Sequence, residues 1–527
     1  MDYLVLHAPR LSRYLEHPFP DGSTALDHIA RRVELLRPML SSTAPVYVLS
    51  AEAPGGTAVP ESWNIVVVTS EDSTSPSSAA AFRALDESLP REEGSVLVSA
   101  LDAPFFDVAL ARYLYILHRH AWCDYTFGDG FPVGYSVEVL RRGILPSLAQ
   151  LAEAGDQRWT RSFVFDALSS DINAFDVETE AATEDLAMLR LSLTVDTQAN
   201  FLLCRRLVER GVANPSDPSD APDPSRERYD HLNVPLLSTV RDDPSLGRTL
   251  PYYYQIQVTD ELSQRPTYLP WNDPVLGAQE PGSGNFLAPG DWDRLISQIA
   301  EVTPEAVLSI GYRGEPGLHQ DLPHLVQTVE QYPALQLYVE TSGIGWTERN
   351  IEALDSSAVQ AVIVELDTID PERYLELRGE GLTEASEFIE RIRRIIPGKV
   401  FVQATRLKET EWELQSFFHH WDKVDGVKPL IQKYNSWAGR LPDRSVVEGP
   451  PLHRIPCWHL QRDMVILMDG SVPRCFQDLP IEEYRGNVFS DGVEAVWRRG
   501  AEEHADHARG TLAPICERCD EYYTFNA

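Results

Sequence analysis

The stretch Ala306–Pro316 reads A-V-L-S-I-G-Y-R-G-E-P, a short apolar run that ends in a turn containing glycine and proline. A run of this length between turn signals is typical of a buried strand in a parallel sheet. Helical patterns follow it and each similar run in this half of the chain. The further strand-like runs are Tyr254–Val258, Leu335–Val339, Ala361–Glu365 and Val400–Ala404. Repeated βα units predict a closed or partly closed (β/α) barrel over residues 251–445.

The first 210 residues show the same alternation. Their strand-like runs are Tyr3–Leu6, Val46–Leu49, Ile65–Val68 and Val96–Ser99. This rhythm predicts an α/β domain with a parallel sheet over residues 1–210. Residues 212–227 then read V-A-N-P-S-D-P-S-D-A-P-D-P-S-R-E. Because repeated Pro, Ser and Asp cannot bury apolar surface, we expect a solvated linker over residues 211–250.

Two cysteine pairs mark the end of the chain, in a short, loop-rich region over residues 446–527. They are Cys457 with Cys475 and Cys516 with Cys519. Two thiolate pairs joined by a chain excursion can enclose one metal centre, and thiolate-rich sites select zinc or iron-sulfur clusters. The spacing alone leaves both metals open. Either would hold a region with so little apolar material folded.

We do not expect the other two cysteines or the histidines near the cysteine pairs to bind a metal. Six cysteines in 527 residues are too few for a disulfide scaffold, which favours a metal site in a reducing compartment. We expect Cys123 and Cys204 to be buried apolar residues. His459, His504 and His507 are not needed as ligands, and we expect them at the surface.

The charge of the chain limits its partners. The formal net charge is −34 and the isoelectric point is near 4.7. Such a field repels phosphates, so we expect neither non-specific nucleic-acid binding nor binding to anionic membranes. The N-terminus lacks a signal-peptide pattern, and no run of 18 apolar residues occurs. We therefore expect a soluble, cytoplasmic protein of about three compact units.

The segment from about 251 to 440 resembles a radical SAM barrel. Gly314, Glu315 and Pro316, with His319 three residues on, resemble the G-E-P-x-x-H motif of that family, and residues 340–343 (E-T-S-G) resemble its E-T-N-G. The resemblance implies that Glu315 and its neighbours contact the amino group of S-adenosylmethionine. The alternative is that Gly314 and Pro316 only form a turn, with Glu315 solvated beside it.

The cluster-binding loop of that family, however, has lost its ligands. A CxxxCxxC loop after the first barrel strand should hold a [4Fe-4S] cluster, but Leu262, Pro266 and Leu269 occupy the three cysteine positions. None of these side chains can ligate iron. Because reductive cleavage of S-adenosylmethionine needs an electron delivered through that iron, we expect no radical formation, and binding of the nucleotide is doubtful.

The C-terminal region resembles a short SPASM or twitch domain, through both cysteine pairs, Gly470 and the Gly486–Asn487 pair. The resemblance implies one auxiliary [4Fe-4S] cluster with no open iron position, held by the four cysteines Cys457, Cys475, Cys516 and Cys519. A structural zinc site remains the alternative.

The N-terminal domain resembles the sugar-nucleotide cytidylyltransferases, a Rossmann-like domain of the GT-A type. The L-D-A-P stretch around Asp102 and the L-T-V-D-T stretch around Asp196 carry the resemblance, which implies that the two carboxylates bind Mg²⁺. The phosphate loop is incomplete, because residues 8–16 (A-P-R-L-S-R-Y-L-E) lack its glycine and lysine. Arg10 and Arg13 could hold one phosphate, or could form a surface pair.

The whole architecture resembles the spirochaete-restricted family called spiro-SPASM. We expect an iron-sulfur protein with an inactive radical SAM barrel and a degenerate nucleotidyltransferase head. Its expected role is that of an accessory protein that binds a nucleotide sugar, a protein or a peptide during surface glycan or peptide modification. One alternative is an active Mg²⁺-dependent cytidylyltransferase that makes a CMP-sugar. Another is a radical SAM enzyme with unusual cluster ligands.

Overall fold

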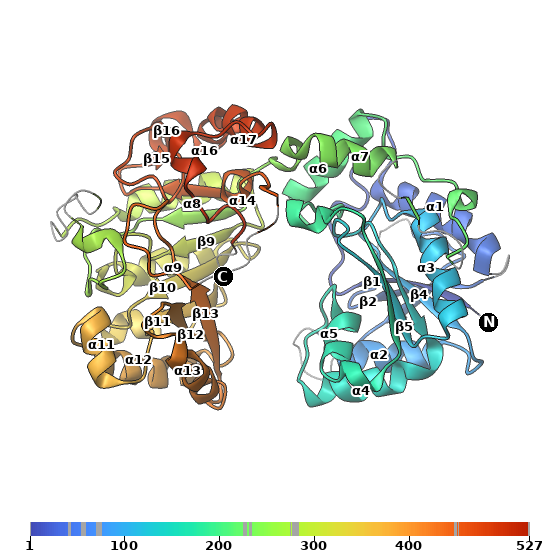
Figure 1. Cartoon of the computed structure of the whole chain (residues 1–527), viewed down its shortest axis with the longest axis horizontal. Coiled ribbons are helices and arrows are strands. Elements are labelled where there is room, and N and C mark those ends of the chain that lie inside the picture. Colours follow the sequence, from blue (N-terminus) through green and yellow to red (C-terminus); the bar gives the residue numbers. More distant parts are fainter. Residues whose placement is uncertain are drawn as a thin grey trace. The chain divides into compact units, whose positions relative to one another are not determined.

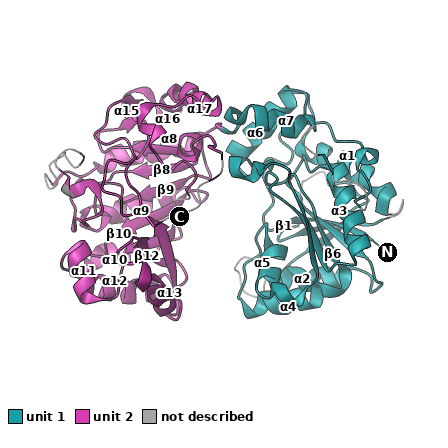
Figure 2. Ribbon diagram, in the orientation of Figure 1, with its two compact units in different colours: residues 1–247 teal, residues 248–527 magenta. Residues whose placement is uncertain are grey.

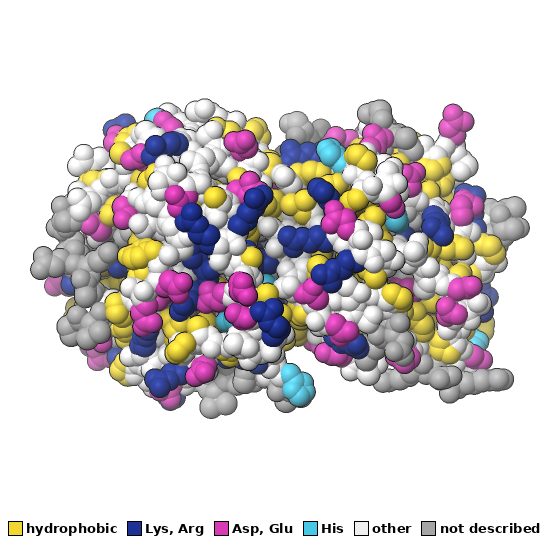
Figure 3. Space-filling view, turned by 90° about the horizontal axis from the view of Figure 1, so that it is seen from above, with side chains coloured by type: hydrophobic (Ala, Val, Ile, Leu, Met, Phe, Trp, Pro, Cys, Tyr) yellow, Lys and Arg dark blue, Asp and Glu magenta, His cyan; other side chains and the backbone are white. Residues whose placement is uncertain are grey.

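The structure is a computed structural model of the chain, and it divides into two compact units (Figure 2), residues 1–247 and 248–527. It describes residues 2–40, 44–53, 59–69, 76–224, 229–230, 234–273, 276, 284–446, 451 and 453–524. Within these ranges no helix is both long enough and apolar enough to cross a membrane. On the face shown in Figure 3, basic and acidic side chains are mixed instead of forming one patch of a single sign.

Unit 1 is built on a seven-stranded sheet (Figure 1) with the order β3-β2-β1-β4-β6-β5-β7. Its strands are β1 (Tyr3–Ala8), β2 (Val46–Ser50), β3 (Asn64–Val67), β4 (Ser95–Ala100), β5 (Tyr125–Asp129), β6 (Glu138–Arg141) and β7 (Val177–Ala181). β6 runs antiparallel to its neighbours β4 and β5, and the other pairs are parallel. The four predicted strand runs form β1 to β4. Because the chain order reverses between β1 and β4, their carboxyl ends form a crevice of the kind that binds ligands.

Helices cover both faces of this sheet. One apolar core joins the sheet to α1 (Ala25–Leu40), α3 (Val108–Ala121), α6 (Gln198–Glu209) and α7 (Pro235–Asp242). The other joins it to α2 (Ser78–Ser88), α4 (Leu145–Ala154) and α5 (Phe163–Ser169). Along β1, Leu4 and Leu6 enter the first core, whereas Tyr3 and Val5 enter the second. This alternation follows from the two-residue period of a strand. As predicted, Cys123 and Cys204 are buried.

The stretch predicted to be a solvated linker packs instead on unit 1. The Ser216 hydroxyl donates to Asp107 (2.6 Å), and so does the Tyr229 hydroxyl (3.2 Å). The apolar face of α7 enters the core with Leu236 and Leu237. The composition of this stretch predicted that it would be solvated. The buried carboxylate of Asp107 instead supplies the hydrogen-bond acceptor that holds it to unit 1. Residues 225–228 and 231–233 of this stretch lie outside the described residues.

Unit 2 contains six parallel strands in sequence order, with a seventh added beside the first: β13-β12-β11-β10-β9-β8-β14. They are β8 (Tyr253–Ile256), β9 (Val307–Ile310), β10 (Gln336–Thr341), β11 (Val359–Glu365), β12 (Val400–Arg406), β13 (Val427–Lys433) and β14 (Asp463–Ile466). The sheet is open, with β13 and β14 at its edges. It matches the predicted partial barrel, except that β14 comes from the C-terminal region, which we had expected to be separate.

Helices follow the barrel strands and fill one continuous core with them. They are α8 (Pro289–Val302), α9 (Leu322–Glu330), α10 (Glu348–Glu352), α11 (Pro371–Arg378), α12 (Leu382–Ile395) and α13 (Leu414–Trp421). The C-terminal region adds α14 (Trp458–Arg462), the antiparallel pair β15 (Ser471–Pro473) and β16 (Tyr484–Asn487), α15 (Val488–Asp491), α16 (Val493–Arg499), α17 (Ala501–Ala508) and α18 (Pro514–Glu517). Val493 and Trp497 of α16 join the barrel core, so the two regions share one apolar interior.

Candidate functional site

Unit 2 encloses a polar cavity of about 230 Å³ inside the partial barrel. Each of the strands β8 to β13 contributes a polar side chain to its wall: Gln255, Ser309, Glu340, Glu365, Gln403 and Lys433. The usual interior of a barrel is filled by branched apolar side chains. A polar lining in this position therefore points to a ligand-binding cavity.

The loop after β8 occupies the place where a radical SAM cluster would be ligated. Leu262, Pro266 and Leu269 line the cavity, as do the intervening residues Ser263 and Gln264. The sequence itself contains no cysteine between residues 205 and 456. A cluster at this loop could therefore not be held by thiolates of this unit's barrel.

Other side chains of this loop bond to the barrel. The Gln264 amide donates to the carbonyl oxygen of Glu380 (2.7 Å) and accepts from Arg378 Nε (3.1 Å). The Tyr268 hydroxyl donates to Asp367 (2.5 Å). These bonds fix the loop to β11 and α11 with protein groups alone.

Glu315 is buried and fully engaged, so the alternative of a solvated Glu315 is wrong. Its carboxylate accepts from the Thr341 hydroxyl (2.5 Å), from both the amide (2.9 Å) and the hydroxyl (2.6 Å) of Ser342, and from the amide of Gly317 (3.2 Å). Pro316 begins a single 3₁₀ turn, as the turn alternative expected. Gly314 is required here because a Cβ at this position would lie 2.0 Å from the Thr259 carbonyl oxygen.

A buried ion pair stabilises the wall beside this loop. Arg378 lies 2.6 Å from Asp367, and both side chains are 1% exposed. A second carboxylate, that of Glu365, lies 3.3 Å from the same guanidinium. Burial raises the pKa of Glu365 to about 7, although Arg378 opposes the shift. Burial also raises the pKa of Glu340. The cavity therefore holds carboxylates that would gain from a cationic partner.

The four C-terminal cysteines meet around a second, smaller cavity. All four line it, together with His459, Gln477 and His507. Burial raises the pKa of each thiol above its ordinary value, to about 11 for Cys516 and about 12 for Cys519. Repulsion from neighbouring thiols adds to the rise for Cys457, Cys475 and Cys519, and Glu503 adds to it for Cys516. Metal ligation requires thiolates, so a strongly positive metal centre must supply the compensating charge.

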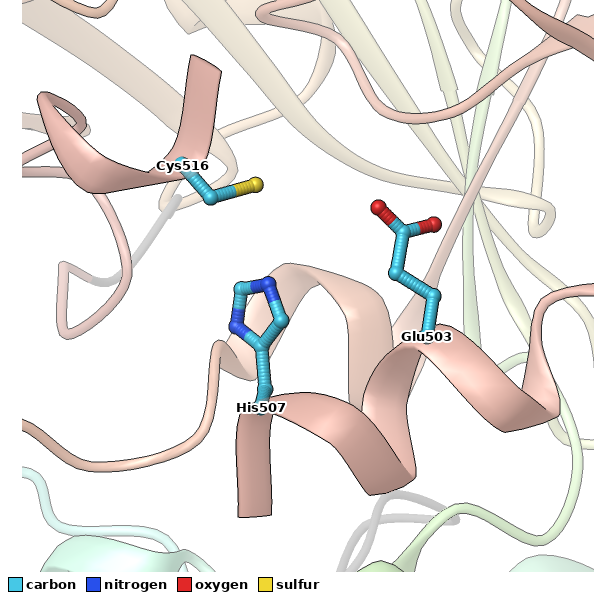
Figure 4. A group of neighbouring side chains, drawn as sticks. All are labelled: Glu503, His507 and Cys516. Atoms are coloured by element: carbon cyan, nitrogen blue, oxygen red, sulfur yellow. The ribbon is translucent and has the colours of Figure 1, made fainter. Parts of the chain in front are cut away.

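In this structure the thiols do not gather as closely as a single tetrahedral ion would hold them. Tetrahedral zinc with bonds of ~2.3 Å brings its sulfurs to ~3.8 Å from one another. Among the described residues, the metal-ligating atoms that gather within 4.8 Å of one another belong to Glu503, His507 and Cys516 (Figure 4), and no three of the cysteine sulfurs do so. A cluster with an iron at each corner accepts thiolates that stand further apart.

Buried polar groups around the thiols give a second reason. Gln477 and His507 are 2% and 5% exposed, and neither the amide atoms of the first nor the ring nitrogens of the second have a hydrogen-bond partner among the described residues. Leaving such a group unpaired costs about 1–3 kcal/mol. The sulfides of a cluster would accept from these donors, and a zinc ion has no acceptor atoms of its own. The donor set fits an iron-sulfur cluster.

The prediction that the three histidines lie at the surface is wrong. His459, His504 and His507 are 2%, 0% and 5% exposed. His459 is held by Asp463 (2.6 Å), and burial lowers the pKa of His507 to about 4. Their sequence pattern gives little sign of burial, because the helix that carries His504 and His507 is short and its apolar residues are all alanines. Their proximity to the cysteine pairs was the signal that could have found them.

The cluster region and the barrel cavity share a wall. Phe476, next to Cys475, and Glu521, two residues after Cys519, both line the barrel cavity. The Glu521 amide donates to Cys519 Sγ (3.4 Å), while its carboxylate lies 2.6 Å from Lys433 at the end of β13. One residue thus contacts a cluster ligand through its backbone and the barrel through its side chain.

In unit 1, Asp102 and Asp196 meet at the crevice, as the motifs predicted, but an arginine joins them. Arg161 donates to Asp102 (2.5 Å) and to Asp196 (3.2 Å). Asp102 follows β4, whereas Asp196 precedes α6 instead of ending a strand. Burial raises the pKa of Asp102 to about 6, with Arg161 opposing the shift, and hydrogen bonds and Arg161 hold that of Asp196 below its ordinary value.

This arrangement does not fit Mg²⁺ as it stands, because the guanidinium occupies the charge position between the carboxylates. Arg161, which lies in the segment before α5, belongs to none of the motifs identified in the sequence. Arg10 and Arg13 are exposed after β1, as the surface alternative expected. Arg13 donates to the Tyr14 hydroxyl (2.6 Å).

Comparison with protein families gives a match over residues 457–520 to SPASM, an iron-sulfur cluster-binding domain. The matched range begins at Cys457 and includes the other three cysteines. The chain therefore carries an iron-sulfur cluster-binding domain, and its cysteine set coincides with the site described above.

Among curated proteins, the chain is 32% identical over 380 residues to an uncharacterized protein of Treponema pallidum, covering 69% of this chain and 99% of that protein. It is 26% identical over 186 residues to the GTP 3′,8-cyclase of Mannheimia succiniciproducens, covering 35% of this chain and about half (52%) of that enzyme. A solved structure of SuiB from Streptococcus suis aligns with a TM-score of 0.40 at 15% identity, over 64% of this chain and 86% of that one. The family match confirms the SPASM domain, and the sequence match to a GTP 3′,8-cyclase supports the predicted similarity to radical SAM enzymes. The cytidylyltransferase-like head and the loss of radical chemistry stay predictions.

Proposed function

The chain belongs to the same family as the uncharacterized Treponema pallidum protein, and we propose that it is an iron-sulfur protein whose barrel binds a ligand without starting radical chemistry. The observation that carries the proposal is the loop after β8. It lacks thiols, and its Gln264 and Tyr268 are bonded to Arg378 and Asp367 of the barrel. Without an iron centre here, no electron can reach the sulfonium of S-adenosylmethionine through the usual route.

The cluster of the C-terminal region is proposed to be a single [4Fe-4S] cluster held by Cys457, Cys475, Cys516 and Cys519. With four thiolates, each of its irons has a protein ligand, so the cluster offers no open position for a substrate. Its contribution to binding is to order the cavity wall. Phe476 and Glu521 reach the barrel from positions beside two of its ligands.

The cavity is proposed to favour a ligand with a positively charged group. Glu340 and Glu365 face it, and Gln255 and Gln403 add amide groups that have no partner among the described residues. The carboxylate of Glu315 is already saturated by protein donors, which leaves it little capacity for a ligand amine. A positively charged group of the ligand, placed between Glu340 and Glu365, would compensate the energetic cost of burying these two carboxylates.

The head is proposed to have lost nucleotide turnover. Both of its carboxylates are paired with Arg161, and the glycine and lysine of the phosphate loop are missing. The role of an accessory protein in surface glycan or peptide modification follows from the family resemblance, as does binding of a nucleotide sugar or peptide. These roles stay predictions.

The test is to purify the chain anaerobically and to measure iron, sulfide and zinc, then to incubate the reduced protein with S-adenosylmethionine. We expect about four irons per chain and no 5′-deoxyadenosine above a protein-free control. Calorimetric titration with S-adenosylmethionine and with its uncharged thioether S-adenosylhomocysteine separates binding from cleavage. Reproducible 5′-deoxyadenosine, abolished by Glu315→Gln, would overturn the proposal.

A further inference from the structure

The cavity of the four cysteines is lined by two buried side chains whose hydrogen-bonding groups are not used by the protein. Gln477 follows Cys475 by two residues, and His507 projects from α17 toward Cys516. Neither the amide of the first nor the ring of the second has a hydrogen-bond partner among the described residues. Buried polar groups are rarely left unpaired, so these two require a partner that the protein itself does not supply.

The position of His507 defines what that partner touches. One ring nitrogen lies within 4.8 Å of both Cys516 Sγ and a Glu503 oxygen, and Figure 4 shows the ring facing the space between them. Glu503 is already paired with Arg474 (2.8 Å) and with Arg485. The remaining direction for the ring N–H is the sulfur of Cys516 and whatever that sulfur binds.

Two arginines lie beside the same site. Arg454 donates to the carbonyl oxygens of Cys516 (2.6 Å) and Cys519 (3.3 Å), and Arg474 lies beside Glu503. Adding one electron to a cluster increases its negative charge. Hydrogen-bond donors and nearby cations stabilise the more negative state, which raises the reduction potential.

We propose that Gln477 and His507 donate N–H groups to the sulfur atoms of the cluster held by the four cysteines, and that these bonds raise its reduction potential. This rests on the proposed iron-sulfur function. The change is a one-electron reduction in which no bond to the cluster breaks. A one-electron donor of the flavin or ferredoxin class could supply the electron. Gln477 and His507 are positioning residues in this role, since they act through the cluster.

The experiment compares the anaerobically purified full chain with His507→Leu and Gln477→Met, which remove the donors at similar volume. The matched control is His453→Leu, an exposed histidine of the same region. Iron and sulfide are counted first, and the midpoint potential is then measured by spectroelectrochemical titration. We expect about four irons in every protein. At a fixed potential, the ratio of reduced to oxidised cluster should fall about tenfold in each donor variant. This change corresponds to a decrease of ~59 mV in the midpoint potential of a one-electron couple.

His507→Gln should return the potential toward that of the unmodified chain, because its amide restores an N–H donor, and His453→Leu should leave it unchanged. Donor variants that keep their iron with an unmoved potential would overturn this inference and leave the proposed function standing. Zinc in the unmodified chain would overturn both. If a donor variant loses its iron, resonance Raman spectra of the unmodified chain in H₂O and D₂O decide. Fe–S bands that do not shift on exchange would refute the hydrogen bonds.

Discussion

Replacing Arg161 by alanine tests whether this side chain stands in for a metal at the head. The substitution removes two charged hydrogen bonds, to Asp102 at 2.5 Å and to Asp196 at 3.2 Å. Breaking a fully buried pair costs about 3–5 kcal/mol. The side chain of Arg161 is 33% exposed, so water can take over part of its role, and we expect a loss of about 2 kcal/mol in the local stability of the crevice.

Magnesium should then restore the lost local stability in the Arg161→Ala variant, and should not stabilise the unmodified chain. An ion at 100 times its dissociation constant stabilises the folded state by about 2.7 kcal/mol, which is close to the expected loss. Because a protein of two units need not unfold in one step, hydrogen exchange of peptides covering residues 95–104 is the appropriate measurement. Arg158→Ala, an exposed arginine of the same segment, is the control. Equal stabilisation of the unmodified chain by Mg²⁺, or none in the variant, would refute the argument.

The pH dependence of stability is an independent check of the predicted role of Arg161. Burial raises the pKa of Asp102 from 3.8 to about 6, so the folded state binds the proton more tightly than the unfolded state and this group's contribution to stability falls as the pH rises through that window. Without Arg161 the pKa rises further. The stability difference between the unmodified chain and Arg161→Ala should therefore be largest near pH 8 and shrink toward pH 5. A difference that is constant over this range would contradict the assignment.

Three further outcomes are expected. Cys516→Ser should remove the iron and increase hydrogen exchange in residues 453–524. Unit 1 should be unaffected, because it has its own cores. Stoichiometric zinc in the unmodified chain, purified from iron-replete cells, would contradict the cluster assignment. Arg378→Met should destabilise unit 2 by about 3–5 kcal/mol in urea unfolding, because Asp367 is left buried without its counter-charge and keeps only hydrogen bonds from Tyr268 and Thr405. The exposed control Lys423→Met should change little. With CTP and acidic or phosphorylated sugars, pyrophosphate release should be negligible, and rapid release that depends on Asp102 would argue for a working cytidylyltransferase.

The sequence predicts those strands whose signals are local. The runs that form β1 to β4 and β8 to β12 are apolar and bounded by turn residues, and each becomes a strand. β13 was missed because it reads V-K-P-L-I-Q-K, with charges and a proline inside it. These residues suit an edge strand, which needs no amide donor on its free side. Edge position is a property of the assembled sheet and cannot be read from one segment.

Long-range pairing explains the other omissions. β14 has only four residues, and its partner β8 lies about 200 positions earlier in the chain. The segment around Ser216 looks solvated until Asp107, more than 100 residues away, is seen to accept its hydroxyl. Arg161 belongs to no motif, and its meaning depends on Asp102 and Asp196 being brought together by the fold. Each of these contacts lies beyond the reach of a local pattern.

The polar groups differ between the two places where protein side chains stand in for a metal or cluster and the C-terminal site, where two whole side chains lack partners within the described part of the chain. In the head, Arg161 pairs with both carboxylates that a metal would otherwise bind, although Asp102 Oδ1 has no hydrogen-bond partner among the described residues. At the barrel loop, Gln264 and Tyr268 bond to barrel side chains and fix the loop in which Leu262, Pro266 and Leu269 occupy the cluster-ligand positions. Around the C-terminal cysteines, by contrast, His507 and Gln477 stay buried without partners among the described residues. Buried side chains that serve a bound group stay unpaired in the protein until that group is present. By this criterion the selected chemistry of the chain lies at its C-terminal cluster.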